Sequence, residues 1–168
     1  MRLAEPVDVP RLWHLCEVMH ADNGAFPLSP SRVVTLLKRA CWKSGSPPAI
    51  ICLIDGPDRI EAAVCLDAQQ HWYSDGWFYA DRFLYVHPAH RRSRHAIKLL
   101  RFCRWWYEAN DRQVPVVISI ETLRNLEAKE RLYGRYARRV GASFVIGEMP
   151  MERIDAECAR AAGAVARQ

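Results

Sequence analysis

The sequence predicts a single mixed α/β (α+β) domain over residues 1–150, followed by a tail over residues 151–168. A chain of 168 residues is long enough to bury a substantial core without disulfide bonds or metals. Half of the residues are apolar and about a quarter are charged, which is typical of a globular protein and excludes a disordered chain. Helical periodicity alternates with short β-branched or aromatic runs, so one fold is expected to contain both kinds of element.

Composition also bears on compartment and on metals. No run approaches the roughly eighteen apolar residues that a membrane span needs. The first residues lack the pattern of a secretory signal, so we expect a cytoplasmic protein with no membrane partner. The six cysteines are scattered without a CxxC pair and are expected to be reduced core residues. His87, His90 and His95 crowd one basic stretch, but no HxxxH pair falls on a predicted helix, so no metal site is predicted.

The N-terminal part of the chain predicts one short strand and two helices. "RLAE" (residues 2–5) is the expected strand, and Asp8 is expected to cap a helix that continues to about Met19. A second helix is expected to begin with Ser29 as its cap and Pro30 as its first residue, and to end before "GSPP".

Strands dominate the middle of the chain. The first two strand candidates flank an Asp-Gly-Pro turn, as expected of a hairpin, and the third is rich in aromatic residues and ends at a proline. The fourth is a β-branched run with the continuous apolar character of a strand buried on both faces. The expected elements are strands at 49–55, 59–69 and 77–88, a helix from 93, a strand at 114–121, a helix at 125–139 and a strand at 142–149.

The stretch "VHPAHRRSRHAIKLLRFCRWW", at 86–106, holds much of the basic excess of a chain whose net charge is +5. Apolar residues from Ala96 to Trp106 recur at helical spacing, and Ser93 is the expected cap, so an amphipathic helix should follow a strand here. A helix N-terminus beyond a strand presents free backbone N–H groups and a positive dipole end, which together bind phosphate. Flanking arginines add charge-assisted hydrogen bonds.

Two other interpretations of this stretch stay open. Basic residues along the helix partly meet the needs of a nucleic-acid recognition helix, but the helix also carries a full apolar stripe and two adjacent tryptophans. No known DNA- or RNA-binding motif accompanies it. A solvated charge run without a ligand is the second alternative. The sequence therefore favours a phosphate-binding loop, and nucleic acid is not the expected partner.

The segment "FLYVHPAHRRSRHAIKLL" resembles the acetyl-CoA-binding motif of the GNAT (Gcn5-related) N-acetyltransferases. That motif is a strand ending in V-x-P, then a loop of pattern Arg/Gln-x-x-Gly-x-Gly/Ala, then a helix. Val86 and Pro88 match the strand end, and Arg91 and Ala96 match the first and last loop positions. Arg94 stands where the family has a glycine that lets the backbone approach the pyrophosphate. This form of the loop is similar to that of phage-encoded members.

The resemblance implies a central, mostly antiparallel mixed sheet of six to seven strands flanked by about four helices. It also implies that the strands at 77–87 and 114–121 splay apart, with the pantetheine arm of the co-substrate acetyl-CoA in the gap. The implied backbone contacts of that arm are Leu84, Tyr85 and Val86. The implied contacts of the pyrophosphate are Arg91, Arg92, Ser93, Arg94, His95 and Ala96.

A second signature of the family, N-x-x-A-x-x-L-Y, is similar to "NLEAKERLY", which supplies Asn125 and Tyr133 with one residue more than the family spacing. Eight helical steps in place of seven rotate Tyr133 by roughly 80° from Asn125. Asn125 is therefore either a contact of CoA or a plain helix cap.

In the family the acetyl group passes directly from the thioester to an amine. The resemblance implies Tyr133 as the acid that protonates the departing thiolate; a core tyrosine is the alternative, and Tyr136 is the second candidate acid. Asp81 and Glu121 are the candidate general bases by position, whereas an ion pair for Asp81 and a helix-start charge for Glu121 are the structural alternatives. If a chain of water molecules carries the proton from the amine, neither Asp81 nor Glu121 is needed as a base. No Cys-His-Asp set predicts a covalent acyl-enzyme, so direct transfer is favoured.

The combined prediction is an acetyl-CoA-dependent N-acetyltransferase whose acceptor is a primary amine of a small molecule or a peptide. The alternatives are a non-catalytic CoA-binding regulatory module and, with less support, a basic nucleic-acid-binding domain. The loops at 20–30 and 70–76 are expected to line the acceptor site without identifying the acceptor. The Ala-rich tail is helix-prone, and packing on the domain, a homodimer contact and mobility all stay open for it.

Overall fold

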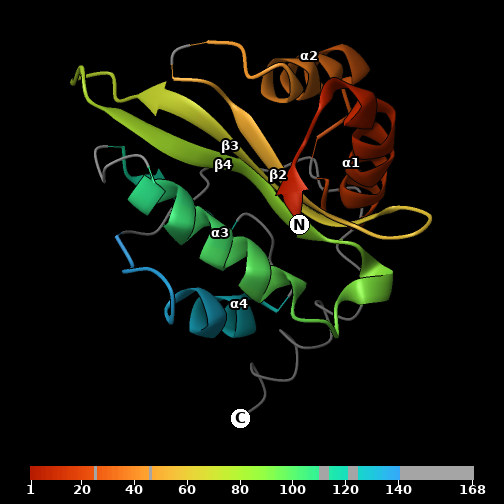
Figure 1. The fold of residues 1–168 in the computed structure, drawn as a ribbon. Helices are drawn as coiled ribbons and strands as arrows, with labels where there is room; N and C mark the ends of the chain where they lie inside the picture. Colours follow the sequence, from red (N-terminus) through yellow and green to blue (C-terminus); the bar gives the residue numbers. More distant parts are fainter. Residues whose placement is uncertain (25, 46, 110–113, 121–124, 141–168) are drawn as a thin grey trace.

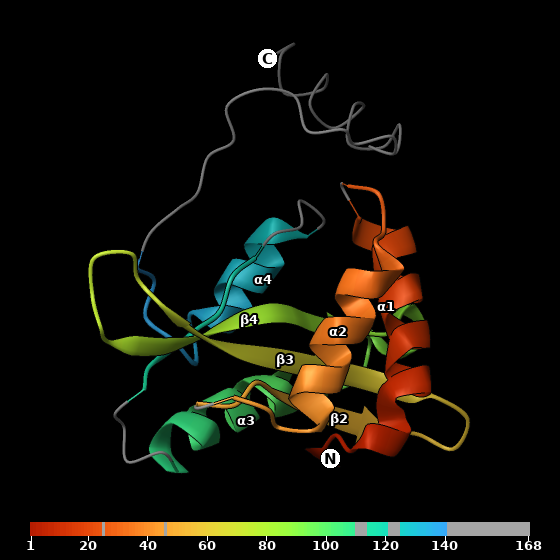
Figure 2. The same ribbon diagram turned by 90° about the horizontal axis from the view of Figure 1, so that it is seen from above.

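A computed structural model describes residues 1–24, 26–45, 47–109, 114–120 and 125–140. α1 (Val9–Asn23) and α2 (Pro30–Cys41) lie together on one face of a twisted sheet, and α3 (His95–Ala109) crosses the other face (Figure 1). The view from above shows the helix pair and α3 on opposite sides of the strands (Figure 2). The fold therefore has three layers, with a core on each side of the sheet.

The sheet is mostly antiparallel, as the resemblance implied. Its strands lie in chain order; the first four pair antiparallel, and the fifth runs parallel to its neighbour. The strands are β1 (Arg2–Leu3), β2 (Ile50–Asp55), β3 (Ile60–Gln70), β4 (Trp77–Val86) and β5 (Val116–Val117). The implied six to seven strands are not confirmed, because the described part of the chain holds five and the expected strand at 142–149 lies outside it.

Each face of the sheet supports its own hydrophobic cluster. Alternate strand residues point to opposite faces, so Leu53 and Cys65 pack against α1 and α2, whereas Cys52 and Val64 pack against α3. β2 and β3 are almost wholly buried. The five cysteines in the described ranges are free and buried, which confirms the prediction of reduced core cysteines for these five.

The start of the first helix differs from the prediction. A 3₁₀ turn at Pro6–Asp8 precedes α1, and α1 continues to Asn23, past its expected end. The Asp8 side chain does not cap α1. Its carboxylate, on a residue only 2% exposed, accepts two bonds from the Arg2 guanidinium, at 2.6 and 2.7 Å, and one from the Glu5 N–H at 2.8 Å. Asp8 therefore joins β1 to the 3₁₀ turn.

For α2 and α4, the predicted first residues are closer to the observed ones than the predicted last residues are. Pro30 begins α2 as predicted, although the Ser29 side chain makes no cap bond. α4 (Leu126–Tyr133) is shorter than the helix predicted at 125–139. After Gly134, a residue of low helix propensity, the next two backbone bonds have the tighter i→i+3 spacing of a 3₁₀ turn. Of the helices in the described part, none is both long and apolar enough to cross a membrane.

Candidate functional site

In the described structure, β5 pairs with β4 along only part of the length of β4. β5 pairs with it through two residue pairs only, Tyr79 with Val116 and Ala80 with Val117. β4 then continues to Val86, and among the described residues no further ladder pair joins its outer edge. Within the described residues the β4–β5 ladder therefore ends at Ala80 and Val117, and the positions that the parallel register puts opposite residues 84–86 lie outside the described ranges. We call the region between residues 81–86 and residues 118–120 the split.

A β-bulge in β4 lies where the split begins. In the β3–β4 ladder Cys65 faces Phe83, but the next residue, Leu66, faces Asp81, which leaves Arg82 without an opposite residue. Bulges of this kind end regular pairing and are common next to active sites. Nothing in the sequence of β4 predicted it.

The bulged residue is anchored on the α1–α2 face of the sheet. The Arg82 guanidinium donates to one carboxylate oxygen of Asp67 at 2.9 and 2.7 Å, and Arg39 of α2 binds the other oxygen. Asp67 is only 3% exposed, so a buried carboxylate is satisfied by two arginines. This cluster holds the bulge in place, which positions the start of the split.

Asp81, a predicted general base, connects the two sides of the split. Its Oδ1 atom accepts hydrogen bonds from the Ser119 N–H and from the Ser119 hydroxyl, each at 2.8 Å. The carboxylate therefore links β4 to the residues after β5 just where the ladder ends. Glu121, the other predicted base, lies outside the described residues.

Tyr133, the predicted acid, is half-buried at the last position of α4. Burial raises the pKa of its hydroxyl above the ordinary value, and the negative charge of Asp81 raises it further. The structure thus brings Tyr133 and Asp81 into one electrostatic neighbourhood and keeps the tyrosine proton on its oxygen at neutral pH.

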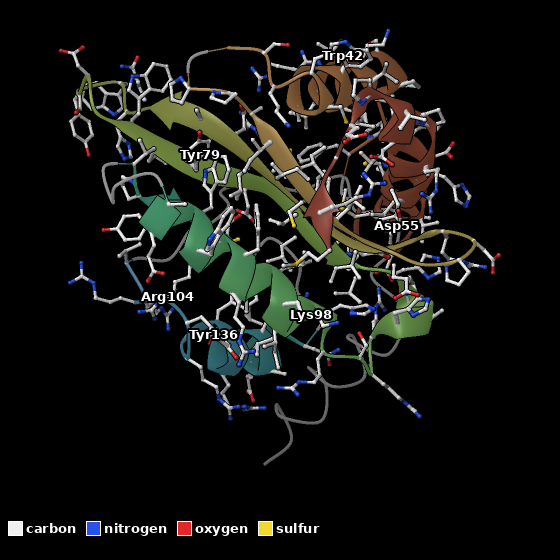
Figure 3. The ribbon with its side chains drawn as sticks, viewed as in Figure 1. Trp42, Asp55, Tyr79, Lys98, Arg104 and Tyr136 are labelled. Atoms are coloured by element: carbon white, nitrogen blue, oxygen red, sulfur yellow. The ribbon has the colours of Figure 1, made fainter. Side chains whose placement is uncertain are left out.

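Tyr136, the second candidate acid, belongs to a different surface. It lines a hollow of about 340 Å³ together with Arg104, Tyr107 and Glu108 of α3. Arg104 and Tyr136 lie on the same side of the molecule, at the outer side of α3 (Figure 3). The structure therefore separates the two tyrosines that the sequence left as alternatives.

The side chains of β4 beyond the bulge alternate across the sheet. Leu84 and Val86 pack into the α3-side cluster, whereas Tyr85 points to the helix pair, where its hydroxyl donates to Asp22 at 3.3 Å. Burial raises the pKa of Tyr85 to about 12. The outer backbone edge of these three residues has no ladder partner in the described part of the chain. That edge supplies the kind of open hydrogen-bonding groups that the resemblance assigned to pantetheine binding.

The basic loop (residues 87–94) connects β4 to α3 and leaves several backbone donors open. Five of its N–H groups already have acceptors, namely those of His87, Ala89, His90, Arg91 and Ser93. Just after the loop, the His95 N–H donates to the Ser93 hydroxyl at 3.1 Å. Within the described part of the chain, no acceptor is present for the N–H groups of Arg92, Arg94, Ala96 and Ile97. These four donors surround the positive end of the α3 dipole.

Arg91 does not stand free beside those donors. Its guanidinium forms an ion pair with Asp22, at the end of α1, and lies over the Tyr85 ring with 5.9 Å to the centroid. Arg91 therefore joins the basic loop to α1, a role that the sequence did not predict. Arg92 and Arg94 are exposed and form no ion pair within the described ranges, so their charges remain available to an anion.

Two details of the predicted motif have a backbone explanation. Arg94 does not have a positive φ, since Lys43 and Asn125 are the only described residues other than glycine that do. The arginine is therefore unstrained at the position where the family has glycine. Asn125 has φ 53°, is exposed, and makes no side-chain cap bond before α4. Asn125 thus stands at the cap position of α4, but its side chain does not cap the helix.

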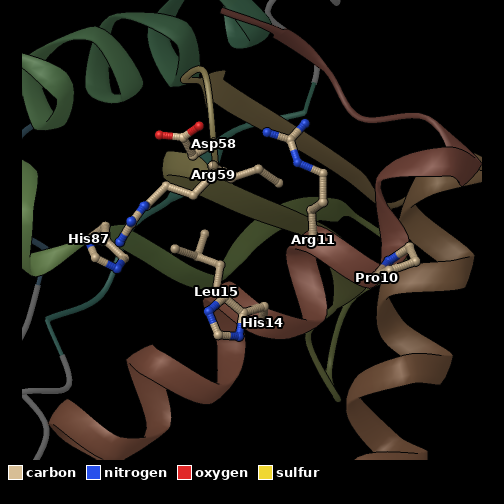
Figure 4. A pocket seen from close by; sticks show the side chains of 8 residues that line it. Pro10, Arg11, His14, Leu15, Asp58, Arg59 and His87 are labelled. Carbon is tan, nitrogen blue, oxygen red and sulfur yellow. The ribbon is translucent and has the colours of Figure 1, made fainter.

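A second surface hollow, of about 210 Å³, lies between α1 and the turn that joins β2 to β3 (Figure 4). Its wall includes Arg11 and His14 from α1, Arg59 from the turn, and His87 from the start of the basic loop. None of the predicted site residues lines it, so it is separate from the split.

Solved structures similar to this one include acetyltransferases. A possible acetyltransferase from Clostridium difficile 630 has a TM-score of 0.66 at 14% identity, over 88% of this chain and 95% of that one. An aminoglycoside acetyltransferase from an uncultured soil metagenomic sample, in complex with trehalose, has a TM-score of 0.63 at 13% identity, over 88% and 94%. The ribosomal-protein-alanine N-acetyltransferase from Brucella melitensis biovar Abortus 2308 has a TM-score of 0.60 at 19% identity, over 87% and 97%.

The sequence itself is more isolated, since no family model and no curated protein matches it. At such low identities the structural likeness establishes a shared fold. The chain therefore has the fold of GNAT-type acetyltransferases.

Proposed function

We propose that this protein is an N-acetyltransferase that moves an acetyl group from acetyl-CoA directly to a primary amine. The observation that carries the proposal is the continuity of two open backbone surfaces. The outer edge of residues 84–86 has no ladder partner among the described residues, and it leads into the basic loop, where four N–H groups likewise have no acceptor. A long ligand with an extended amide arm and a pyrophosphate matches that succession.

The residues present fit acetyl-CoA. The N–H groups of Arg92, Arg94, Ala96 and Ile97 would hold the pyrophosphate, with the two exposed arginine side chains adding charge. The backbone of residues 84–86 would hold the pantetheine amides. When bound, acetyl-CoA supplies an activated acetyl thioester. Ser93 contributes indirectly, because its hydroxyl takes the His95 N–H and so shapes the loop.

Tyr133 and Asp81 have complementary roles in this proposal. Tyr133 is protonated at neutral pH, and we assign it as the proton donor to the departing thiolate from its position. Burial and the Asp81 charge raise the pKa of its hydroxyl and so make it a weaker acid. Asp81 fixes the width of the split through Ser119 and, as a carboxylate at that position, would accept the proton of the incoming amine. Glu121 remains a candidate base from its sequence position alone.

Direct transfer fits the described cysteines better than a covalent acyl-enzyme does. Cys103 is 2% exposed, and burial raises its pKa to about 12, so it is a poor thiolate nucleophile. Five free, buried thiols also fit the reducing cytoplasm as the proposed compartment.

The acceptor we propose is a primary amine of a small molecule or a peptide. Both classes occur among the similar structures, since one is an aminoglycoside acetyltransferase in complex with sisomicin and another is a ribosomal-protein-alanine N-acetyltransferase. The loops at 20–30 and 70–76 remain the proposed acceptor walls. In the second of these, His71 stacks on Tyr73 and Phe78, and Trp72 is 94% exposed.

Thermal unfolding with and without acetyl-CoA, followed by thiol release over a panel of amines, tests the proposal. At 100 times the dissociation constant, acetyl-CoA should stabilise the protein by about 2.7 kcal/mol and raise the Tm by roughly 5–10 °C. Some amines in the panel should then release free CoA thiol. If the Tm rises but no amine releases thiol, the protein is a regulatory CoA-binding module. If the Tm is unchanged and DNA binds with strong salt dependence, the basic nucleic-acid-binding alternative replaces the proposal.

A further inference from the structure

Three potential metal ligands from separate elements meet behind the basic loop. Glu61 is at the start of β3, His90 ends the 3₁₀ turn at Pro88–His90, and His95 is the first residue of α3. One ligand atom from each lies within 4.8 Å of the other two. We propose that these three side chains form a zinc site. The sequence predicted no metal site because Glu61 is about thirty residues away from the two histidines along the chain.

The distances are close to those of a tetrahedral zinc site. Zinc–nitrogen and zinc–oxygen bonds of about 2.0–2.2 Å place neighbouring ligand atoms about 3.3 Å apart. Glu61 Oε2 lies 2.6 Å from His95 Nε2 and 3.7 Å from His90 Nδ1, so these two distances need to change by less than about 1 Å. The ligand nitrogens of the two histidines lie within 4.8 Å of each other. The rings of His90 and His95 stack with their centroids 5.9 Å apart.

The ligand chemistry also favours zinc. Two imidazoles and one carboxylate are a donor set that suits zinc, and three protein ligands leave a fourth position for water or an anion. Calcium and magnesium prefer all-oxygen sets, so they do not fit. The site is partly shielded, since the three side chains are between 12% and 30% exposed.

The three side chains do not satisfy one another without an ion. One carboxylate oxygen of Glu61 faces both histidines, and a single proton between Glu61 and His95 leaves His90 at 3.7 Å. Zinc would replace the shared proton and bond to all three groups at once.

The backbone near Glu61 keeps the carboxylate in this position. A Cβ atom at Gly56 would lie 2.4 Å from Glu61 Oε1, so only glycine leaves room for the side chain where it is. The Glu61 carbonyl also accepts a hydrogen bond from the His87 N–H at 2.8 Å, which fixes the start of the basic loop beside it.

Zinc at this site would clamp the basic loop. His90 and His95 bracket Arg91–Arg94, so an ion bound to both and to β3 would hold the loop at each end. None of the zinc ligand atoms belongs to the split or to the open N–H groups, so zinc binding can be measured without CoA.

Isothermal titration of the chelator-treated full-length protein with zinc chloride, in the absence of CoA, tests the site directly. We expect one zinc ion per chain. His90→Ala should weaken zinc binding by more than roughly 100-fold, since even changes behind the ligands cost 10–100-fold. The His90 side chain lies 3.7 Å from Glu61, too far for a hydrogen bond, and it belongs to a short 3₁₀ turn. The variant is therefore expected to fold.

His14→Gln is the matched control, since His14 forms an exposed pair with Glu17 at 3.5 Å, which is the alternative surface site for zinc. This variant should bind zinc like the unmodified protein. If the two variants lose zinc affinity equally, or if His90→Ala keeps its affinity, zinc binds adventitiously at the surface. Either result would overturn the proposal. Absence of zinc binding to the unmodified protein would overturn it too, while leaving the acetyl-CoA test unaffected.

A spectroscopic measurement identifies the ligands without relying on affinity. Cobalt(II) in the site should absorb visible light as a four-coordinate ion, and Glu61→Gln should change that spectrum because the amide is a weaker ligand than the carboxylate. An unchanged spectrum in Glu61→Gln would exclude the carboxylate as a ligand.

Discussion

The two halves of β4 differ in what lies along their outer edge. At Tyr79 and Ala80 the strand is paired on both sides, with β3 and with β5. From Phe83 to Val86 its described ladder partners all belong to β3, and a bulge at Arg82 precedes this segment. The same strand is thus ordinary sheet in its first half and, in its second half, the edge that we propose as the binding edge.

This difference separates what stabilises the fold from what binds the ligand. On the β1–β3 side, strand pairing is complete and side chains are buried on both faces, so substitutions there should change stability. At the split and the basic loop, the function that we propose depends on backbone groups and on Tyr133, which add little to the core. Substitutions there should change binding or catalysis while the Tm stays nearly constant.

The largest expected effect is a loss of stability on the β1–β3 side of the sheet, where strand pairing is complete. Leu53→Ala removes a side chain that is 0% exposed in β2, and it should lower the free energy of unfolding by about 3 kcal/mol. Denaturant unfolding measures this change. Val117→Ala, at a 39% exposed position of β5, is the control and should cost less than about 1 kcal/mol. Equal costs would show that the two sides do not differ in this way.

The next effect is on catalysis. Tyr133→Phe removes the hydroxyl that we assign as the proton donor, so kcat should fall about 100-fold, while the Tm changes by no more than about 2 °C. Steady-state kinetics with an amine found in the panel measures it. Tyr136→Phe is the control on the other hollow and should keep near-normal kcat. A fall in the Tm with unchanged kcat would make Tyr133 a core tyrosine.

Local pattern accounts for most of the fold and for the position of the basic loop. The paired hairpin strands, the start of α2 at Pro30 and the apolar stripe of α3 all follow from periodicity and turn residues, which act over a few positions. The shortness of β5 could not be predicted, since nothing in the β-branched run after residue 113 indicates that only two of its described residues pair with β4.

Long-range pairs account for what the sequence could not predict. Arg91 was expected to face a phosphate, but its partner Asp22 lies 69 positions away, at the end of α1. Asp8 was expected to cap a helix, but Arg2 competes for its carboxylate with two charge-assisted bonds. Such contacts arise only when the tertiary fold brings the side chains together.

A smaller effect tests the open N–H groups. Ala96→Pro removes one of the four donors at the second position of α3, so the dissociation constant for CoA should rise about tenfold, the equivalent of one charge-assisted hydrogen bond. The fold should tolerate it, because proline is accepted in a first helical turn and α1 already carries Pro10 at its second position. Ala96→Ser, which keeps the N–H, should bind CoA normally. Equal affinities of the two variants would show that this donor does not contact the ligand.

The smallest expected effect is a pH dependence of stability that originates at Asp8, next to β1 on the β1–β3 side of the sheet. Arg2 holds the pKa of Asp8 below its ordinary value of about 3.9, so the ionised carboxylate stabilises the folded state. The contribution is complete above that ordinary value and is lost as the pH falls through the lowered pKa. Since the Arg2 side chain is 40% exposed, Asp8→Asn should cost about 1 kcal/mol at neutral pH.

Urea unfolding of both proteins between pH 3 and pH 8 measures this difference. It should stay constant from pH 8 to about pH 5 and shrink below about pH 4, where the unmodified protein begins to lose the charge of Asp8. Affinity for CoA should be equal in the two proteins, because Asp8 connects β1 to the 3₁₀ turn and touches neither the split nor the basic loop. A change in CoA affinity without a change in stability would contradict the division between a stabilising and a binding side of the sheet.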